Sequence, residues 1–290
     1  MIEKAIFISR IENLKYVSSK YMRLYFGNEF CQKLLPSINE LEKVLNYCGK
    51  NKLRFSLVTP YVTDEGLKDM ERLFSFLKNS KPRLDCEVII NDWGVLDMLN
   101  EEDYNFRPVL GRLLTKQSRD PRISSVINRK LQPPGFVKQG NKCALTFTVT
   151  PPATLLSYYK ESNINVPVIQ DFLIKKRINR IELDNLFQGM NLRLPKDDLS
   201  ASLYVPYGYI ATTRLCSANP FENRKKYYCK ISFCKKECQK YTLRLMNPDM
   251  LKTVFKKGNT VFFKNTKVPA GRYLRKRGIN RLVYQPEIPV

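Results

Sequence analysis

Four of the chain's eight cysteines lie close together, at Cys216, Cys229, Cys234 and Cys238. If the end of this segment is helical, Cys234 and Cys238 lie one turn apart on one face. That separation suits two thiolates on one metal centre and suits a disulfide poorly, because the side chains would have to leave their rotamers. Four thiolates hold either a tetrahedral zinc ion or a 4Fe–4S cluster.

The residues around these thiols are strongly basic. Four thiolates leave either kind of centre with a net charge of about −2, which neighbouring cations would offset while lowering the thiol pKa values. Zinc ribbons prefer paired C-x₂-C motifs, which this segment lacks, so the spacing favours iron–sulfur over zinc. The basic residues are Arg224, Lys225, Lys226, Lys230, Lys235 and Lys236.

Cys31 is a fifth candidate ligand, because it follows the strand-like run at 21–26. It competes with Cys238 for one ligand position. The local set of Cys216, Cys229, Cys234 and Cys238 is favoured, since ordering ligands on one segment costs less chain entropy than recruiting a distant loop. The remaining thiols, Cys48, Cys86 and Cys143, have the sequence context of ordinary core residues.

The chain contains no histidine. This excludes Ser-His and Cys-His nucleophile pairs and mixed Cys/His zinc sites. A metal must therefore bind to thiolates or carboxylates, and a general base must be Asp, Glu, Lys, Tyr or Cys.

Strand-like runs alternate with helical stretches along the chain, which predicts βαβ units and a parallel sheet. Repeated right-handed units close into a barrel, so the predicted fold is an α/β protein of the (β/α) TIM-barrel type, possibly incomplete or distorted. The strands are predicted at 21–26, 52–60, 86–94, 107–114, 143–149, 180–186 and 201–210, and helices at 37–50, 63–78 and 95–102.

In such a barrel the functional face lies at the carboxyl ends of the strands. Polar residues that follow or end predicted strands are therefore candidate catalytic residues, although Asp and Asn there more often cap helices and form turns. These candidates are Asn91, Asp92, Arg112, Glu182, Asp184 and Arg214.

One domain spanning residues 1–290 is expected, with three special segments. Residues 115–142 are polar, basic and interrupted by Pro and Gly, which predicts an inserted loop or lid. Residues 212–240 form the cysteine-rich segment. Residues 247–290 form a predicted basic C-terminal extension, with a short helix near 249–255 followed by two strands.

The net charge of +23 is unevenly distributed along the chain. Residues 1–110 carry 16 basic and 16 acidic side chains, whereas residues 111–290 carry 34 and 11. Such a one-sided field attracts polyanions, which makes RNA a candidate partner of the second half. The N-terminal residues lack the features of a signal peptide and no apolar run is long enough to span a membrane, so we expect a cytoplasmic protein without membrane contact.

Several motifs together resemble the collagenase-like peptidase family of unassigned catalytic type. They are "CEVIINDWGVL", "VLGRLLTKQSRDPRI", "RIELDNL" and "SLYVPYGYIATTRLC", followed by the closing cysteines. The resemblance extends from about Tyr21 to Gln285 and implies a (β/α) barrel with a 4Fe–4S cluster on four cysteines.

Members of that family act as hydroxylation factors, on a base in tRNA or ribosomal RNA or in oxygen-independent ubiquinone synthesis. In one member of the ubiquinone pair, an early cysteine joins three late ones. That pattern implies Cys31, Cys216, Cys229 and either Cys234 or Cys238. The family's peptidase-type "HG" signature is absent.

The expected function is therefore that of an iron–sulfur redox protein, a hydroxylation or modification factor acting on RNA or a quinone precursor, with a partner subunit of the same family as a further possibility. Two alternatives are a peptidase of the collagenase-like family and a zinc-stabilised RNA-binding protein without catalysis.

Overall fold

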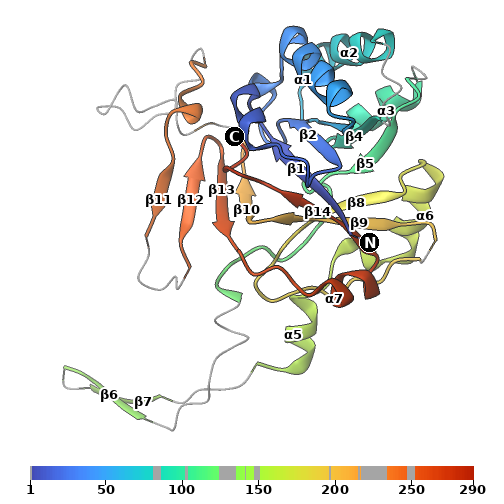
Figure 1. The fold of residues 1–290 in the computed structure, drawn as a ribbon. Coiled ribbons are helices and arrows are strands. Elements are labelled where there is room, and N and C mark those ends of the chain that lie inside the picture. The colour runs from blue at the N-terminus through green and yellow to red at the C-terminus, as the bar shows by residue number, and fades with distance from the viewer. Residues whose placement is uncertain are drawn as a thin grey trace.

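A computed structural model describes residues 2–80, 86–101, 104–123, 135–140, 142–146, 151–195, 197–214, 216, 234–246 and 252–290. Within these residues the core of the molecule is a closed barrel of eight parallel strands (Figure 1). The strands are β1 (Glu3–Ile8), β2 (Arg23–Gly27), β3 (Arg54–Val58), β4 (Cys86–Ile90), β5 (Arg107–Leu110), β8 (Arg180–Asp184), β9 (Ser200–Val205) and β14 (Ile279–Tyr284). The predicted α/β barrel is thus confirmed.

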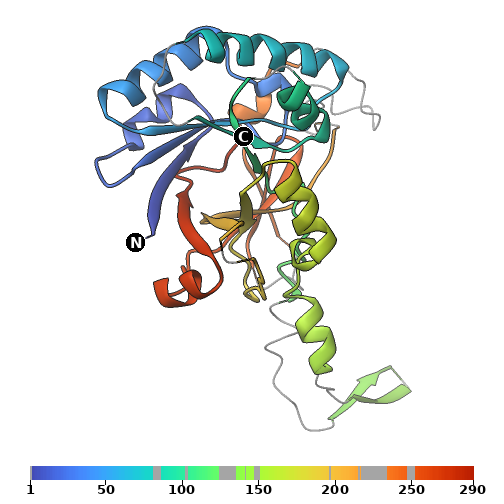
Figure 2. The same ribbon diagram turned by 90° about the vertical axis from the view of Figure 1, so that its right-hand side faces the viewer.

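Three helices cover the first half of the barrel, each following a strand: α1 (Ile38–Lys50), α2 (Asp64–Asn79) and α3 (Trp93–Glu101). The start of α1 is fixed by a capping box between Ser37 and Glu40, and Thr63 accepts the amide of Gly66 at the start of α2. Both arrangements satisfy amides that the first helical turn leaves free. Figure 2 shows α1 and α2 along the outside of the barrel.

The second half of the barrel has a sparser cover. Helices α6 (Pro167–Lys175) and α7 (Gly271–Lys276) precede β8 and β14, and no helix lies in the described chain between β8 and β9. Strands β5 and β8 pair only at Leu110 and Ile181. The barrel is therefore regular on one side and incomplete on the other.

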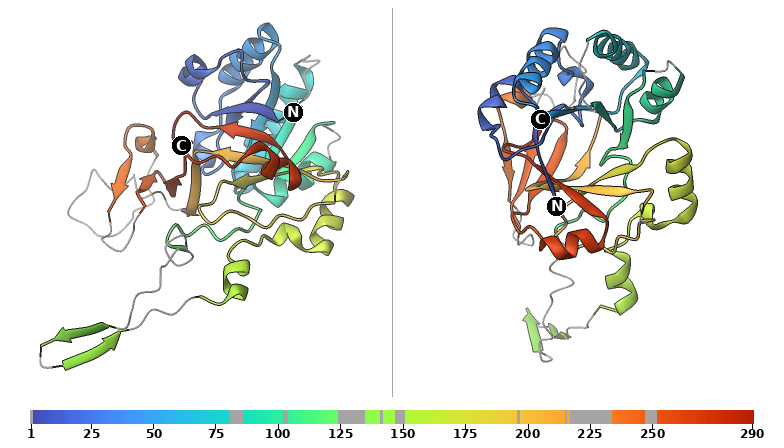
Figure 3. Two further views of the ribbon diagram at one scale, coloured as in Figure 1. Left: turned by 60° about the horizontal axis from the view of Figure 1, so that its bottom comes forward. Right: turned by 45° about the vertical axis from the view of Figure 1, so that its right-hand side comes forward.

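A four-stranded antiparallel sheet is inserted between β9 and β14. Its order is β10-β13-β12-β11, and Figure 3 shows it beside the barrel. The cis peptide bond between Val205 and Pro206 separates β9 from β10, so the single strand predicted at 201–210 is two strands in different sheets. The four strands of the inserted sheet are β10 (Tyr207–Thr212), β11 (Leu243–Leu245), β12 (Val254–Lys257) and β13 (Thr260–Lys264).

The predicted C-terminal extension at residues 247–290 is not confirmed. Its last strand, β14, pairs with both β1 and β9 and closes the barrel. The helix predicted near 249–255 is wrong where the structure describes it, because Val254 begins β12.

The segment between β5 and β8 departs from the barrel pattern. The strand predicted at 143–149 is β7 (Lys142–Thr146), which pairs with β6 (Gly135–Gln139) in a separate hairpin. That hairpin lies apart from the barrel, as does the short helix α5 (Ala153–Tyr158) (Figures 1 and 2). A period-two pattern predicts a strand, but it does not predict the partner of that strand.

Alternate residues of the barrel strands face inwards and outwards. The outward residues pack with the helices into the main core, which includes Leu24, Leu57 and Met70. The inward residues form a separate cluster along the barrel axis, in which the largest side chains are Phe7, Tyr25 and Tyr204. Among the described helices, none has the length and apolar character that a membrane span requires.

Candidate functional site

The loop that carries Cys31 leaves the carboxyl end of β2 and is held by its own first residues. Gly27 has a φ of +133°, and a Cβ atom there would lie 2.1 Å from the carbonyl oxygen of Val58, so no side chain fits. The Oδ1 atom of Asn28 then accepts the amides of Phe30 and Cys31, each at 2.9 Å. This turn directs Cys31 to the mouth of the barrel at the carboxyl ends of the strands.

Asn259, in the turn between β12 and β13, connects this loop to the segment that precedes Cys216. Its Nδ2 atom lies 2.6 Å from the carbonyl oxygen of Phe30 and 2.7 Å from that of Thr213. It also lies 3.0 Å from the hydroxyl of Tyr61. One buried amide therefore joins three segments that are far apart in the sequence.

Cys238 lies against the same turn. It is 3% exposed and belongs to an apolar cluster with Phe30, against which Cys31 also packs. Gly258 has a φ of +60°, and a Cβ atom there would lie 3.0 Å from the Cβ atom of Cys238. The β12–β13 turn thus contacts the early cysteine loop and the late cysteine segment together.

The thiols of Cys31, Cys216, Cys234 and Cys238 lie close enough to influence one another. Burial raises the pKa of Cys31, and the neighbouring Cys234 and Cys216 raise it further. Burial raises the pKa of Cys238 to about 12, with added repulsion from Cys216, Cys31 and Cys234. These raised pKa values favour the protonated thiols. Binding of a metal would favour the thiolates instead, because a coordinating thiol is deprotonated.

The four thiols are gathered without forming a closed coordination shell. Among the described residues, no three cysteine, aspartate or glutamate side chains already form a group that could hold a metal ion. The condition that Cys234 and Cys238 lie on one helix is not met over the described part, where Lys236 is left-handed and a 3₁₀ turn covers only Glu237–Gln239. Cys229 lies outside the described residues.

Beside the thiols, the mouth contains a buried network of two arginines and two carboxylates. Arg112 donates from Nε to Oε1 of Glu29 at 3.0 Å, from Nη2 to Oε2 of Glu29, and from Nη1 to Asp184 at 2.7 Å. Arg119 donates from Nε to the other oxygen of Asp184 at 2.6 Å. The guanidinium of Arg112 also stacks on Tyr204 at 4.0 Å.

This network has no net charge and fixes the mouth. The Nη2 atom of Arg119 donates to the carbonyl oxygens of Arg112 and Thr115, and the hydroxyl of Tyr209 donates to Arg112 as well. Loss of Arg112 would leave Glu29 and Asp184 without one of their partners, and breaking a buried pair in this way typically costs about 3–5 kcal/mol.

The structure brings together two of the six predicted catalytic residues, Arg112 and Asp184. Asn91 fixes neighbouring loops, since Nδ2 donates to Thr59 and Oδ1 accepts the amide of Leu113. Asp92 accepts the amides of Gly94 and Val62, so it has the capping role that is common for Asp after a strand.

The other two candidates lie apart from this network. Glu182 points into the barrel interior, where its Oε1 atom accepts the hydroxyl of Tyr25 at 3.0 Å. Burial raises the pKa of Glu182 to about 8. Arg214 is exposed at the rim, 5.8 Å from the ring centroid of Tyr61.

Sequence reasoning missed Glu29 and Asn259 as site residues. A charged residue within a strand-end loop that also contains a cysteine was a usable signal for Glu29. Asn259 carried no such signal, because an Asn next to a Gly predicts only a turn.

No family model matches the chain, and no curated protein does. Among solved structures, a U32 peptidase is similar with 9% sequence identity and a TM-score of 0.46, covering 100% of this chain and 95% of that one. A glycoside hydrolase family 18 N-acetylglucosaminidase from Paenibacillus barengoltzii has 8% identity and a TM-score of 0.36, with 98% and 94% covered. A family GH18 chitinase from Cycas revoluta has 6% identity and a TM-score of 0.29, with 97% and 94% covered. These likenesses concern the barrel and do not extend to function.

Proposed function

We propose that this protein binds an iron–sulfur cluster at the mouth of the barrel and acts as a redox factor, with Cys31, Cys216, Cys234 and Cys238 as ligands. The observation that carries the proposal is the β12–β13 turn, which contacts the loop of Cys31, the segment before Cys216, and Cys238 together. This contact makes Cys31 a candidate ligand beside the late cysteines, and Cys229, which lies outside the described residues, is compared with it by mutation below.

The donor set fits such a centre chemically. All candidate ligands are thiols, in a chain without histidine, and thiolates are the ligands of iron–sulfur clusters. When bound, the cluster would supply one-electron transfer. The β12–β13 turn would position the ligands, because its Asn259 holds the loops that lead to Cys31 and Cys216.

The residues beside the thiols would form the substrate side of the mouth. The network of Arg112, Glu29 and Asp184 keeps its charges paired and buried, so it supplies a rigid wall. Arg214 and Tyr61 lie at the rim, where they would contact a substrate that approaches the centre. The chemical step is proposed to be a hydroxylation or a related modification.

Peptide hydrolysis is the alternative that the family resemblance leaves open. It would require a nucleophile and a base at the mouth. Glu29 and Asp184, the buried carboxylates there, already accept hydrogen bonds from arginines. This pairing argues against either carboxylate as the base of a peptidase, and the peptidase stays an alternative to the redox proposal.

The first test is metal analysis of protein purified anaerobically. We expect about four iron and four sulfide per chain, with little zinc and absorbance near 400 nm. Cys31→Ala, Cys216→Ala and Cys238→Ala should each lose most of the iron. Cys143→Ala, on the separate hairpin, and Cys48→Ala, on α1, serve as controls and should retain it.

Three results would contradict the proposal or its ligand set. Full iron content in Cys31→Ala with loss in Cys229→Ala would restore the local ligand set. Stoichiometric zinc without sulfide would favour a structural zinc site, and cleavage of casein by metal-free protein would favour the peptidase.

A further inference from the structure

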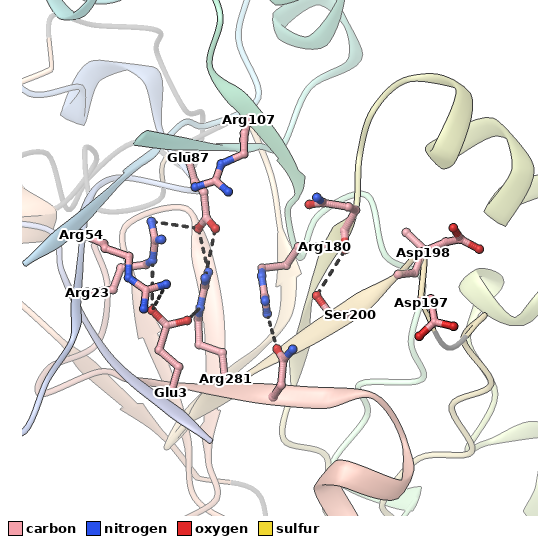
Figure 4. Close-up of a pocket in the computed structure, with 13 residues that line it drawn as sticks. Glu3, Arg23, Arg54, Glu87, Arg107, Arg180, Asp197, Asp198, Ser200 and Arg281 are labelled. Atoms are coloured by element: carbon pink, nitrogen blue, oxygen red, sulfur yellow. Dashed lines mark hydrogen bonds and ion pairs between the residues drawn. The ribbon is translucent and has the colours of Figure 1, made fainter. Parts of the chain in front are cut away.

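The amino end of the barrel, opposite the thiols, contains a pocket of about 390 Å³. Five arginines line it: Arg23 on β2, Arg54 on β3, Arg107 on β5, Arg180 on β8 and Arg281 on β14 (Figure 4). Because parallel strands all begin at this end, five separate strands direct a guanidinium group into one space.

Two carboxylates in this pocket are shared among three of the arginines. Glu3 lies 3.3 Å from Arg23, 3.7 Å from Arg54 and 2.7 Å from Arg281. Glu87 lies 3.3 Å from Arg23 and 2.7 Å from Arg281. Arg23 and Arg281 are almost fully buried in this arrangement, so these pairs close the end of the barrel.

The pocket nevertheless has more positive than negative groups. Arg180 donates to two neutral oxygens, to Oγ of Ser202 at 3.2 Å and to Oδ1 of Asn280 at 2.7 Å. The remaining lining carboxylates, Asp197 and Asp198, are exposed and lie beyond Arg180, away from the other arginines (Figure 4). Among the described residues, the part of the pocket around Glu3 and Glu87 therefore has five guanidinium groups and two carboxylates.

The crowding of the arginines lowers the pKa of two of them, Arg107 and Arg180. Burial lowers the pKa of Arg180, and repulsion from Arg281 lowers it further. The pKa of Arg107 is also lowered, by burial and by repulsion from the neighbouring arginines Arg23, Arg281 and Arg54. An anion in the pocket would relieve this repulsion, and arginine forks bind phosphate oxygens in a bidentate manner.

We infer that this pocket binds a phosphate or diphosphate group of a small ligand. The volume is at the lower end of the range for small-molecule sites and exceeds what one phosphate ion fills. Among the described residues of the lining, only Leu199 has an apolar side chain, so the rest of the ligand is expected to be polar, as in a phosphorylated sugar or free diphosphate.

This site is separate from the proposed metal centre. On β8, Arg180 begins the strand at the pocket and Asp184 ends it at the mouth. On β2, Arg23 begins the strand, and Cys31 lies in the loop beyond its end. Anion binding can therefore be tested without iron, and its failure would leave the proposed function unaffected.

The test is calorimetric titration of the purified chain with phosphate and with diphosphate at low ionic strength, with chloride as the non-specific anion. We expect saturable binding of diphosphate to the wild type. Arg54→Gln, at the pocket rim, and Arg180→Gln should each weaken it at least about tenfold, the loss typical of one charge-assisted contact. Arg72→Gln, on the exposed face of α2, is the matched control and should bind as the wild type does.

Thermal unfolding gives a second measurement, because a ligand of the folded state raises Tm. The inference is overturned if millimolar phosphate and diphosphate give neither saturable heat nor a rise in Tm beyond that of chloride. It is also overturned if Arg72→Gln weakens binding as much as Arg54→Gln does. Binding of RNA alone, unchanged in Arg54→Gln, would assign anion recognition to another surface.

Discussion

Glu182 shows how the environment of a single residue sets its chemistry. The residue ends no strand and touches no solvent. It lies in the barrel interior beside Tyr25, whose hydroxyl accepts from Arg281 at 2.6 Å while donating to the carboxyl. With a pKa raised by burial to about 8, Glu182 keeps its proton at neutral pH in the folded protein. Its sequence context predicted a catalytic carboxylate, and that role stays a prediction for a side chain that lies in the barrel interior, apart from the mouth.

Glu182 should make stability depend on pH in a definite direction. Between the ordinary carboxyl pKa and about 8, the unfolded chain releases this proton and the folded chain retains it, so the free energy of unfolding falls as pH rises. Glu182→Gln keeps an acceptor for Tyr25 and cannot ionise. We expect it to be more stable than the wild type at pH 9 by a few kcal/mol, since each unit of pKa shift is worth about 1.4 kcal/mol.

Urea unfolding at pH 6 and pH 9 measures this difference. Glu42→Gln, an exposed change on α1, should leave the wild-type pH dependence intact. An equal loss of stability with pH in the wild type and Glu182→Gln would show that this carboxyl does not titrate as described.

At the scale of elements, the β12–β13 turn organises the mouth although it is remote in sequence from most of what it contacts. Asn259 binds the loop after β2 and the segment after β10, and Gly258 packs on Cys238. Without the Asn259 side chain, the backbone oxygens of Phe30 and Thr213 lose a buried donor, which typically costs about 1–3 kcal/mol.

Asn259→Ala is therefore expected to make the loop that carries Cys31 open more often. In the metal-free variant, the half-buried Cys31 should react faster with an alkylating reagent than it does in the metal-free wild type. If local opening of the loop costs 1 kcal/mol less, the rate rises about fivefold. Mass spectrometry of tryptic peptides gives the rate for each cysteine.

Asn265→Ala is the matched control for this experiment. Asn265 directly follows the other end of β13, and its Nδ2 atom donates to Asn185, away from the cysteines. If both variants alkylate Cys31 at the wild-type rate, the turn does not hold the loop.

Some elements were predictable from the sequence and others were not, for physical reasons. Amphipathic spacing and caps predicted α1 and α2, because one face of each helix is buried and the other is exposed. Strand β1 was missed, and the run at 21–26 was taken as the first strand. The segment Glu3–Ile8 is short and ends in four consecutive buried residues, so it lacks the alternation of a half-exposed strand.

The candidate site was predictable in part as well. Thiol clustering in the sequence suggested a metal centre, which stays a prediction, and the position of Cys31 after a strand indicated the mouth of the barrel. The arrangement of Arg112 with Glu29 was not predictable, because ion pairs between distant segments depend on the closed fold.

At the scale of the whole molecule, RNA binding by residues 111–290 stays a prediction, and it is based on the excess positive charge of that half. Helix α7 exposes Arg272, Arg275 and Lys276. The guanidinium of Arg277 makes contacts within the protein, since it stacks on Tyr273 at 3.6 Å and donates to the carbonyl oxygen of Met190. The exposed cations are therefore the ones to test.

Changing Arg272, Arg275 and Lys276 together to Ala should weaken RNA binding. The log–log dependence of affinity on salt, about −0.7 per neutralised phosphate on single strands, should flatten by about two. Filter binding of tRNA at several salt concentrations measures both quantities.

The matched control changes Lys43, Lys50 and Lys68 to Ala, which removes three exposed charges from the electrically balanced half of the chain. Equal weakening in the two triple variants would mean that RNA responds only to net charge.

The pairing of β1 with β14 has a consequence for how the chain is made. Glu3 lies beside Arg281, so the barrel closes between residues that are 278 positions apart in the sequence. During translation β1 leaves the ribosome long before β14, and the edge that pairs with β14 stays open until residues 279–284 emerge. Unpaired strand edges promote aggregation, and such distant pairings form slowly. Until β14 is made, the nascent barrel is an open sheet, and this is the period in which a chaperone would contribute most to its yield.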